Sequence, residues 1–218
     1  MANSKIENLT ELAVAPATTD VLPIVDDPAG SPVTKKITVA NLTSDVDPRG
    51  IHDMPVSSSA MWASTTLPAG GLTQVETTSN KQDFMVWEFD TTLVESVQFT
   101  TPIPREYDNG TVTATFYWTN AAGLTTETVD WGIKAVAMGD NDTWDVAWGT
   151  EITTTDTWIA QGDIHTVTSA AITVGGTPVD ADFIQWQITR KTSTDNLTGD
   201  ARLIGIVLHI TTDASVSA

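Results

Sequence analysis

Alternating apolar and polar residues mark the clearest predicted strand, residues 111–119. One face of this run is apolar and consists of Val112, Ala114, Phe116 and Trp118. The intervening positions are polar or amphipathic, and the Asn109-Gly110 pair just before the run is typical of a tight turn. Because side chains alternate between the two faces of a strand, this pattern predicts a strand with one buried face.

Similar runs follow along the chain, and helical periodicity is almost absent after residue 61. Residues 84–89, 93–99, 128–137, 183–190 and 203–211 are expected to be strands, and 111–119 and 128–137 are expected to pair as a hairpin. In the last run Ile204, Ile206, Leu208 and Ile210 are expected to face inward, with Leu203 and Val207 on the other face. Short strands separated by frequent turns predict an all-β fold, a jelly-roll-like antiparallel β-sandwich over residues 61–213.

The chain before this domain has a different residue pattern. Two β-type runs, residues 20–25 and 33–39, flank a connector rich in proline and glycine, which predicts a β-hairpin. A lone hairpin is at best marginally stable in water, so this one is expected to be completed by other chains. Residues 1–46 are therefore interpreted as an attachment and oligomerisation arm, in which the apolar residues expected to contact partners are Val21, Leu22, Ile24, Val25, Ile37, Val39 and Leu42. Residues 47–60 are interpreted as a linker from their Pro, Gly, Ser and Asp content, and 214–218 as a tail.

Charge narrows the range of partners. The 218 residues carry 10 Lys and Arg against 28 Asp and Glu, a formal net charge of -18, which repels nucleic acid and anionic membranes. There is no cysteine, so no disulfide framework is possible. The N-terminus lacks the pattern of a secretory signal, and no apolar run reaches the length of a membrane span.

Candidate chemistry is sparse, and a non-enzymatic protein without cofactor or metal is predicted. Asp140, Asp142 and Glu151 occupy positions 1, 3 and 12 of a calcium-type loop, but Trp144 and Asp145 stand where an oxygen ligand and glycine are needed. The three histidines have no paired spacing. Glu88 and Glu95 could form a glycosidase-like carboxylate pair, although such pairs are expected by chance in an acidic chain.

The tryptophans carry the main alternative. Trp118, Trp131 and Trp186 fall on inward faces and are expected in the core. Trp144, Trp148 and Trp158 fall near loops, where exposed rings could stack on a sugar, or could instead cap the sandwich or fill a subunit interface. A carbohydrate-binding sandwich is therefore the alternative to a purely structural role.

Two sets of residues carry a resemblance to tailed-bacteriophage virion proteins. Residues 20–25 (DVLPIV) and 34–42 (TKKITVANL) resemble the attachment segment of fibre and head-fibre proteins. Residues 131–138 (WGIKAVAM), 170–178 (AAITVGGTP), 183–190 and 200–211 are similar to a β-sandwich of phage virion proteins.

The resemblance implies a protein of the virion surface, made in the cytoplasm of a bacterial host. It implies a homotrimer bound through its N-terminal arm to other virion proteins, most simply the major capsid protein. The short chain favours a capsid decoration, cement or head-fibre protein over a long tail fibre. The alternative is a tail fibre or receptor-binding protein whose sandwich binds a host surface glycan.

Overall fold

A computed structural model describes residues 21–26, 33–38, 50–120, 122–179 and 182–212. It divides the chain into two compact units, Met1–Pro48 and Arg49–Ala218. The described part of the first unit is an antiparallel hairpin of β1 (Val21–Asp26) and β2 (Val33–Thr38), in which Val21 lies opposite Thr38. The predicted pair of strands is therefore confirmed.

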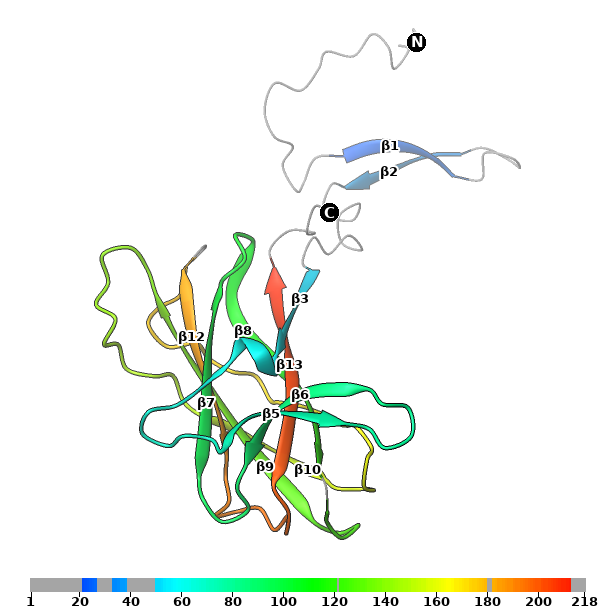
Figure 1. The fold of residues 1–218 in the computed structure, drawn as a ribbon. Helices are drawn as coiled ribbons and strands as arrows, with labels where there is room; N and C mark the ends of the chain where they lie inside the picture. The colour runs from blue at the N-terminus through cyan, green and yellow to red at the C-terminus, as the bar shows by residue number, and fades with distance from the viewer. Residues whose placement is uncertain (1–20, 27–32, 39–49, 121, 180–181, 213–218) are drawn as a thin grey trace, which may run out of the picture. The chain divides into compact units, whose positions relative to one another are not determined.

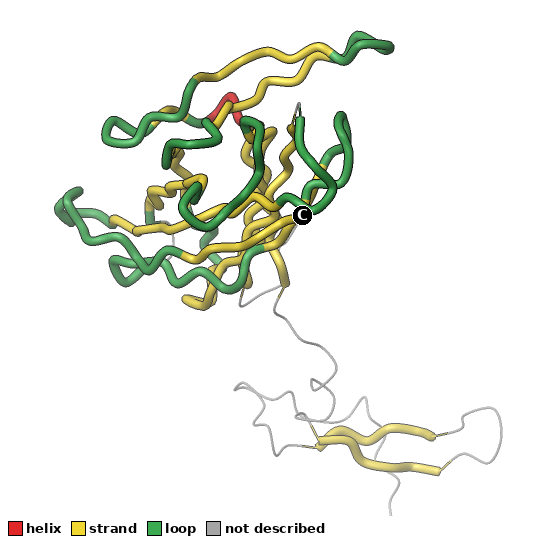
Figure 2. Tube along the Cα trace, turned by 90° about the horizontal axis from the view of Figure 1, so that it is seen from below, coloured by secondary structure: helices red, strands yellow, loops and turns green. Residues whose placement is uncertain are grey.

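The second unit is a sandwich of two antiparallel β-sheets (Figures 1 and 2). The five-stranded sheet has the order β10 (Ile152–Thr157), β9 (Thr128–Met138), β12 (Phe183–Arg190), β7 (Glu95–Pro102) and β4 (Trp62–Ala63). The six-stranded sheet has the order β11 (His165–Thr168), β8 (Tyr107–Asn120), β13 (Ala201–Thr212), β6 (Asp83–Phe89) and β5 (Gly71–Glu76), with β3 (Gly50–Ser57) also paired to β13. This architecture confirms the prediction of an all-β, jelly-roll-like sandwich.

Aromatic side chains from both sheets fill the space between them. Trp118, Trp131 and Trp186 are fully buried, as predicted. The Trp131 ring meets the edge of Phe89 at a centroid distance of 5.2 Å and stacks on Phe116 at 5.9 Å. Since Trp131 belongs to one sheet and its two partners to the other, these contacts hold the layers together.

The predicted pairing of 111–119 with 128–137 is wrong. These runs become β8 and β9, which belong to different sheets, so the connector between them crosses the sandwich. Alternation determines which face of a strand is buried, but it does not determine the neighbouring strand.

The predicted linker at residues 47–60 is also wrong over most of its length. Residues 50–57 form β3, which pairs with β13 from Gly50 opposite Thr212 to Ser57 opposite Gly205. A short 3-10 turn, Ser58–Ala60, follows and is fixed by a hydrogen bond from Trp87 Nε1 to the Ser58 carbonyl of 2.9 Å. The linker was predicted partly because Pro55 argues against a strand. Proline is nevertheless tolerated in a strand that pairs along one side only, as β3 does.

A β-bulge changes the faces of the last strand. The register of β13 against β8 shifts between Leu203 and Gly205, and Leu203 is buried in the core. The prediction that Leu203 faces outward and Ile204 inward is therefore wrong, because one extra residue reverses the alternation on one side of the bulge. The bulge also marks a change of neighbour, since β13 pairs with β6 over residues 201–203 and with β3 over residues 205–212.

A buried arginine joins the end of β12 to two other segments. The Arg190 side chain is fully buried and pairs with Asp195, Nε to Oδ2 being 2.8 Å. Its terminal nitrogens donate to the carbonyls of Phe89, Leu197 and Gly199 at 2.8–3.0 Å. Together with a second bond to Asp195, these contacts use all five guanidinium N–H groups.

Glu127 fixes the same end of the sandwich. Burial acts to raise the pKa of its carboxyl group, but hydrogen bonds from the N–H groups of Thr198 and Leu124 and from the Thr198 hydroxyl outweigh it and lower the pKa. The connector before β9 is thereby tied to the loop that carries Asp195.

Candidate functional site

A groove of about 680 Å³ lies on the outer face of the five-stranded sheet. The strand register places a row of side chains across four strands on this face, with Trp62 of β4 opposite Gln98 of β7, Gln98 opposite Gln187 of β12, and Gln187 opposite Lys134 of β9. Directly paired residues share a face, so the row crosses the sheet at right angles to the strands. With strands about 4.8 Å apart, the row spans roughly 14 Å.

The loop after β9 forms one wall of the groove. It contributes Asp142, Trp144, Asp145, Val146 and Trp148, and Met138 and Phe183 also line the groove. Trp144 is 91% exposed and Trp62 is 44% exposed. Large rings exposed together on a monomer's surface are unusual and are typical of binding sites.

Three glutamine amides form a directed chain that alternates between β12 and β7 and runs along these two strands. Gln185 Nε2 donates to Gln98 Oε1 at 3.1 Å, and Gln98 Nε2 donates to Gln187 Oε1 at 3.2 Å. Gln187 Nε2 then donates to Ser96 Oγ at 3.2 Å. The chain fixes the orientation of each amide, while Gln98 and Gln185, which line the groove, keep further N–H groups and lone pairs for a ligand.

A glycine contact positions the loop that carries Trp148. β10 pairs with β9 only as far as Ile133, and beyond that point Gly149 and Gly175 bond to the free edge of β9. Both of their N–H groups donate to the Ala135 carbonyl, at 3.0 and 3.1 Å. A Cβ atom on Gly149 would lie 2.4 Å from the Thr173 carbonyl oxygen, so this approach requires glycine.

Trp148, which precedes Gly149, is also positioned by a contact with a side chain of the sheet. Lys134 Nζ lies 5.2 Å from the centroid of the Trp148 ring, a cation–π distance. Trp62 thus stands at one end of the row of side chains, and Trp148 lies beside Lys134 at the other end. Such an arrangement offers flat apolar surfaces at both ends and hydrogen-bonding groups between them.

The structure brings two of the three candidate glycan-binding tryptophans together. Trp144 and Trp148 both line the groove. Trp158 lies elsewhere and is only 7% exposed, as part of the hydrophobic core beside Gly123, so its ring cannot stack on a ligand. The expectation that Trp158 offers an exposed ring is wrong because its loop folds back over the core.

Sequence reasoning missed Trp62 and the glutamines. Trp62 follows the supposed linker and belongs to a strand of two residues, too short for any periodic signal. Gln185 and Gln187 alternate with the inward-facing residues Ile184, Trp186 and Ile188. This alternation was the sequence signal that places both glutamines on the outer face of the strand.

The candidate attachment residues lie in the first unit. Val21, Leu22, Ile24 and Val25 belong to β1 and Ile37 belongs to β2, whereas Val39 and Leu42 lie outside the described residues. Their role in attachment and oligomerisation stays a prediction.

The acidic residues considered for catalysis or metal binding have separate roles. Glu88 and Glu95 belong to different sheets, and burial raises the pKa of Glu95, whose carboxylate accepts the Asp90 N–H at 2.7 Å. Asp142 accepts the Gly139 N–H, while Glu151 pairs with Lys191. Among the residues that the structure describes, no three acidic or histidine side chains gather as a metal site.

No helix of the described part of the chain has the length and apolar character to cross a membrane.

Comparison with known proteins gave structural similarity only. No family model and no curated protein matches the sequence. Among solved structures, a xylan-binding CBM22-2 domain from Paenibacillus barcinonensis aligns with 73% of this chain and 98% of its own, at 12% identity and a TM-score of 0.42. A CBM35 from the same organism aligns over 72% and 97% at 10% identity and 0.41. The CBM36-1 domain of a xylanase from the hindgut metagenome of Trinervitermes trinervoides aligns over 72% and 96% at 12% identity and 0.38. Because these scores are low, the groove is interpreted from its own residues.

Proposed function

We propose that the sandwich is a non-catalytic carbohydrate-binding domain and that the groove is its glycan site. The observation that carries the proposal is the groove itself, in which the rings of Trp62, Trp144 and Trp148 and the amides of Gln98 and Gln185 line one surface on the outer face of the sheet. Aromatic rings can cover the apolar C–H faces of sugars, and amides can donate to and accept from their hydroxyl groups.

The electrostatics of the groove favour a neutral glycan. Asp142 and Asp145 line it, and the nearby cation Lys134 is engaged with the Trp148 ring. The formal net charge of -18 adds a long-range repulsion of anions. The groove is lined from Trp62 on β4 to Trp148, which lies beside Lys134 of β9, so an oligosaccharide would lie across the strands.

Replacement of Trp62 or Trp148 by alanine tests this function. Each change is expected to weaken binding of a neutral oligosaccharide by about tenfold or more, since loss of a central aromatic anchor often costs roughly 2 kcal/mol. Binding would be measured on a glycan array and then by calorimetry with the best neutral ligand.

Ile51→Ala is a matched control, because Ile51 is an exposed hydrophobic residue on β3 of the other sheet. It is expected to leave binding unchanged. The proposal fails if the wild-type protein binds no saccharide, or if both tryptophan variants bind as tightly as the wild type.

Attachment to a phage particle is a second candidate function, favoured by the separate β1–β2 unit. A two-stranded hairpin gains stability from further partners, and virion proteins or other copies of this chain, as in a homotrimer, could supply them. Deletion of residues 1–46 removes both hairpin strands and leaves every strand of the sandwich. The shortened chain is expected to fold and to be lost from purified particles. Incorporation at the wild-type level would contradict the attachment role.

A further inference from the structure

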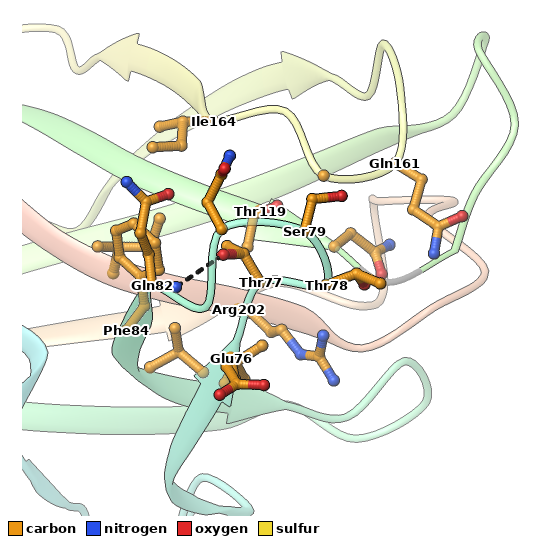
Figure 3. A pocket seen from close by; sticks show the side chains of 16 residues that line it. Glu76, Thr77, Thr78, Ser79, Gln82, Phe84, Thr119, Gln161, Ile164 and Arg202 are labelled. Carbon is orange, nitrogen blue, oxygen red and sulfur yellow. Dashed lines mark hydrogen bonds between the residues drawn. The ribbon is translucent and has the colours of Figure 1, made fainter.

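A second recess, of about 540 Å³, lies on the outer face of the six-stranded sheet (Figure 3). It lies beside the bulge of β13, at Arg202 and Ile204. Because β13 leaves β6 after residue 203 and pairs with β3 from residue 205, the first half of β6 does not pair with β13, and its Met85 carbonyl instead accepts a hydrogen bond from Ser58 Oγ. The pocket is therefore a consequence of the change of strand partner.

The two walls of the pocket are preformed. The turn between β5 and β6 is closed by the Thr77 N–H donating to the Gln82 carbonyl at 2.8 Å and by the Gln82 N–H donating to Thr77 Oγ1 at 2.9 Å. The opposite wall, residues 161–164, is held to β8 by Thr119 Oγ1, which donates to the Asp163 carbonyl at 2.8 Å. Little ordering is needed before a ligand binds, which favours affinity.

The lining combines an apolar surface with free polar groups. Val75, Phe84, Val86, Ile164 and Ile204 supply the apolar part. The side chains of Thr78, Ser79, Asn80 and Gln161 also line the pocket, and they make no hydrogen bond among the described residues. The volume lies within the range of small-molecule sites, roughly 300–1,000 Å³.

The charges that line the pocket are already balanced. Arg202 Nε donates to Glu88 Oε1 at 3.0 Å, and Lys81 Nζ pairs with Glu76 Oε2 at 2.8 Å. The terminal nitrogens of Arg202 make no hydrogen bond to the described residues and remain as donors. A balanced pocket gives no net attraction to an anion but can still donate to hydroxyl or ring oxygens.

We propose that this pocket is a second binding site, which takes a neutral mono- or disaccharide. One apolar face of the sugar would lie on Phe84 and Ile204, and its hydroxyl groups would meet Arg202, Thr78, Ser79 and Gln161. The domain then binds sugars on both outer faces of the sandwich, through two sites that share no lining residue.

Titration of the full-length, isotope-labelled protein with methyl glycosides of glucose, galactose, mannose and N-acetylglucosamine tests the proposal by NMR. At least one glycoside is expected to shift the backbone resonances of residues 77–82 and 161–164 at millimolar concentration. Gln161→Ala and Arg202→Met are each expected to weaken this effect about fivefold, the equivalent of one hydrogen bond. Gln161 is exposed, so its variant is expected to keep the fold even if Arg202→Met does not.

Trp62→Ala provides the control that separates the two sites. It is expected to weaken the binding reported by shifts around the groove by about tenfold or more, and to leave the shifts of residues 77–82 unchanged. The second site is disproved if no glycoside shifts residues 77–82 and 161–164, if Gln161→Ala has no effect, or if glucuronate binds as tightly as the glucoside. If the groove binds no sugar but the second site does, only residues 77–82 and 161–164 would shift.

Discussion

Replacing Arg190 by methionine is expected to lower the free energy of unfolding by about 3–5 kcal/mol. The change leaves the Asp195 carboxylate buried, with 2% of its side chain exposed, and without its counter-ion. It also removes the donors of three carbonyl groups, those of Phe89, Leu197 and Gly199. Buried groups that lose their partners keep the full cost of desolvation, which exceeds the modest net value of a hydrogen bond. Urea denaturation of the purified protein measures the loss.

A double variant distinguishes the charge from the packing. Arg190→Met combined with Asp195→Leu removes both charges and is expected to recover part of the lost stability. A loss below about 1 kcal/mol in the single variant would show that water reaches the pair and that the network is not buried in solution.

Substitution of Gly149 by valine is expected to impair stability and glycan binding together. The new Cβ would lie within 2.9 Å of three backbone atoms, in Thr173, Ala135 and Gly175, and backbone atoms yield less easily than side chains. We expect a loss of about 1–3 kcal/mol from overpacking. The displaced loop carries Trp148 away from Lys134, so affinity for the groove ligand is expected to fall about tenfold. Calorimetry and thermal unfolding give the two quantities.

Gly70→Ala is the matched control for this variant. A Cβ at Gly70 meets only the Glu88 carbonyl, at 3.4 Å, an ordinary contact distance. It is expected to change neither quantity measurably. Normal glycan binding by a folded Gly149→Val protein would contradict the role of the glycine contact.

The sequence was sufficient for the class of fold because strands with one buried face impose a period of two. Residues 111–119, 128–137 and 183–190 follow that period closely, and all three are strands. The pairing of strands could not be predicted from the sequence, because β8 and β9 are consecutive in the chain but lie in different sheets. The single-residue bulge at Ile204 also leaves no local signal that distinguishes it from continued alternation.

Of the residues in the candidate site, only those in the loop after β9 could be predicted from the sequence. Trp144 and Trp148 were suspected because aromatic residues in polar loops are often exposed. The floor of the groove depends on register between four strands, so Trp62, Gln98 and Gln185 gather only once the sheet is known. The buried Arg190 is a similar case, since an arginine at the end of a strand is expected to reach solvent.

The pairing of β3 with β13 makes the sandwich a portable module. Its first and last described residues, Gly50 and Thr212, lie opposite each other, and the Gly50 N–H donates to Thr212 Oγ1 at 3.2 Å. A domain whose entry and exit points coincide can be inserted into a surface loop of a carrier protein as readily as it can be joined end to end. The same geometry allows a circular permutation in which a short connector joins residues 212 and 50 and new ends open in the 77–82 turn.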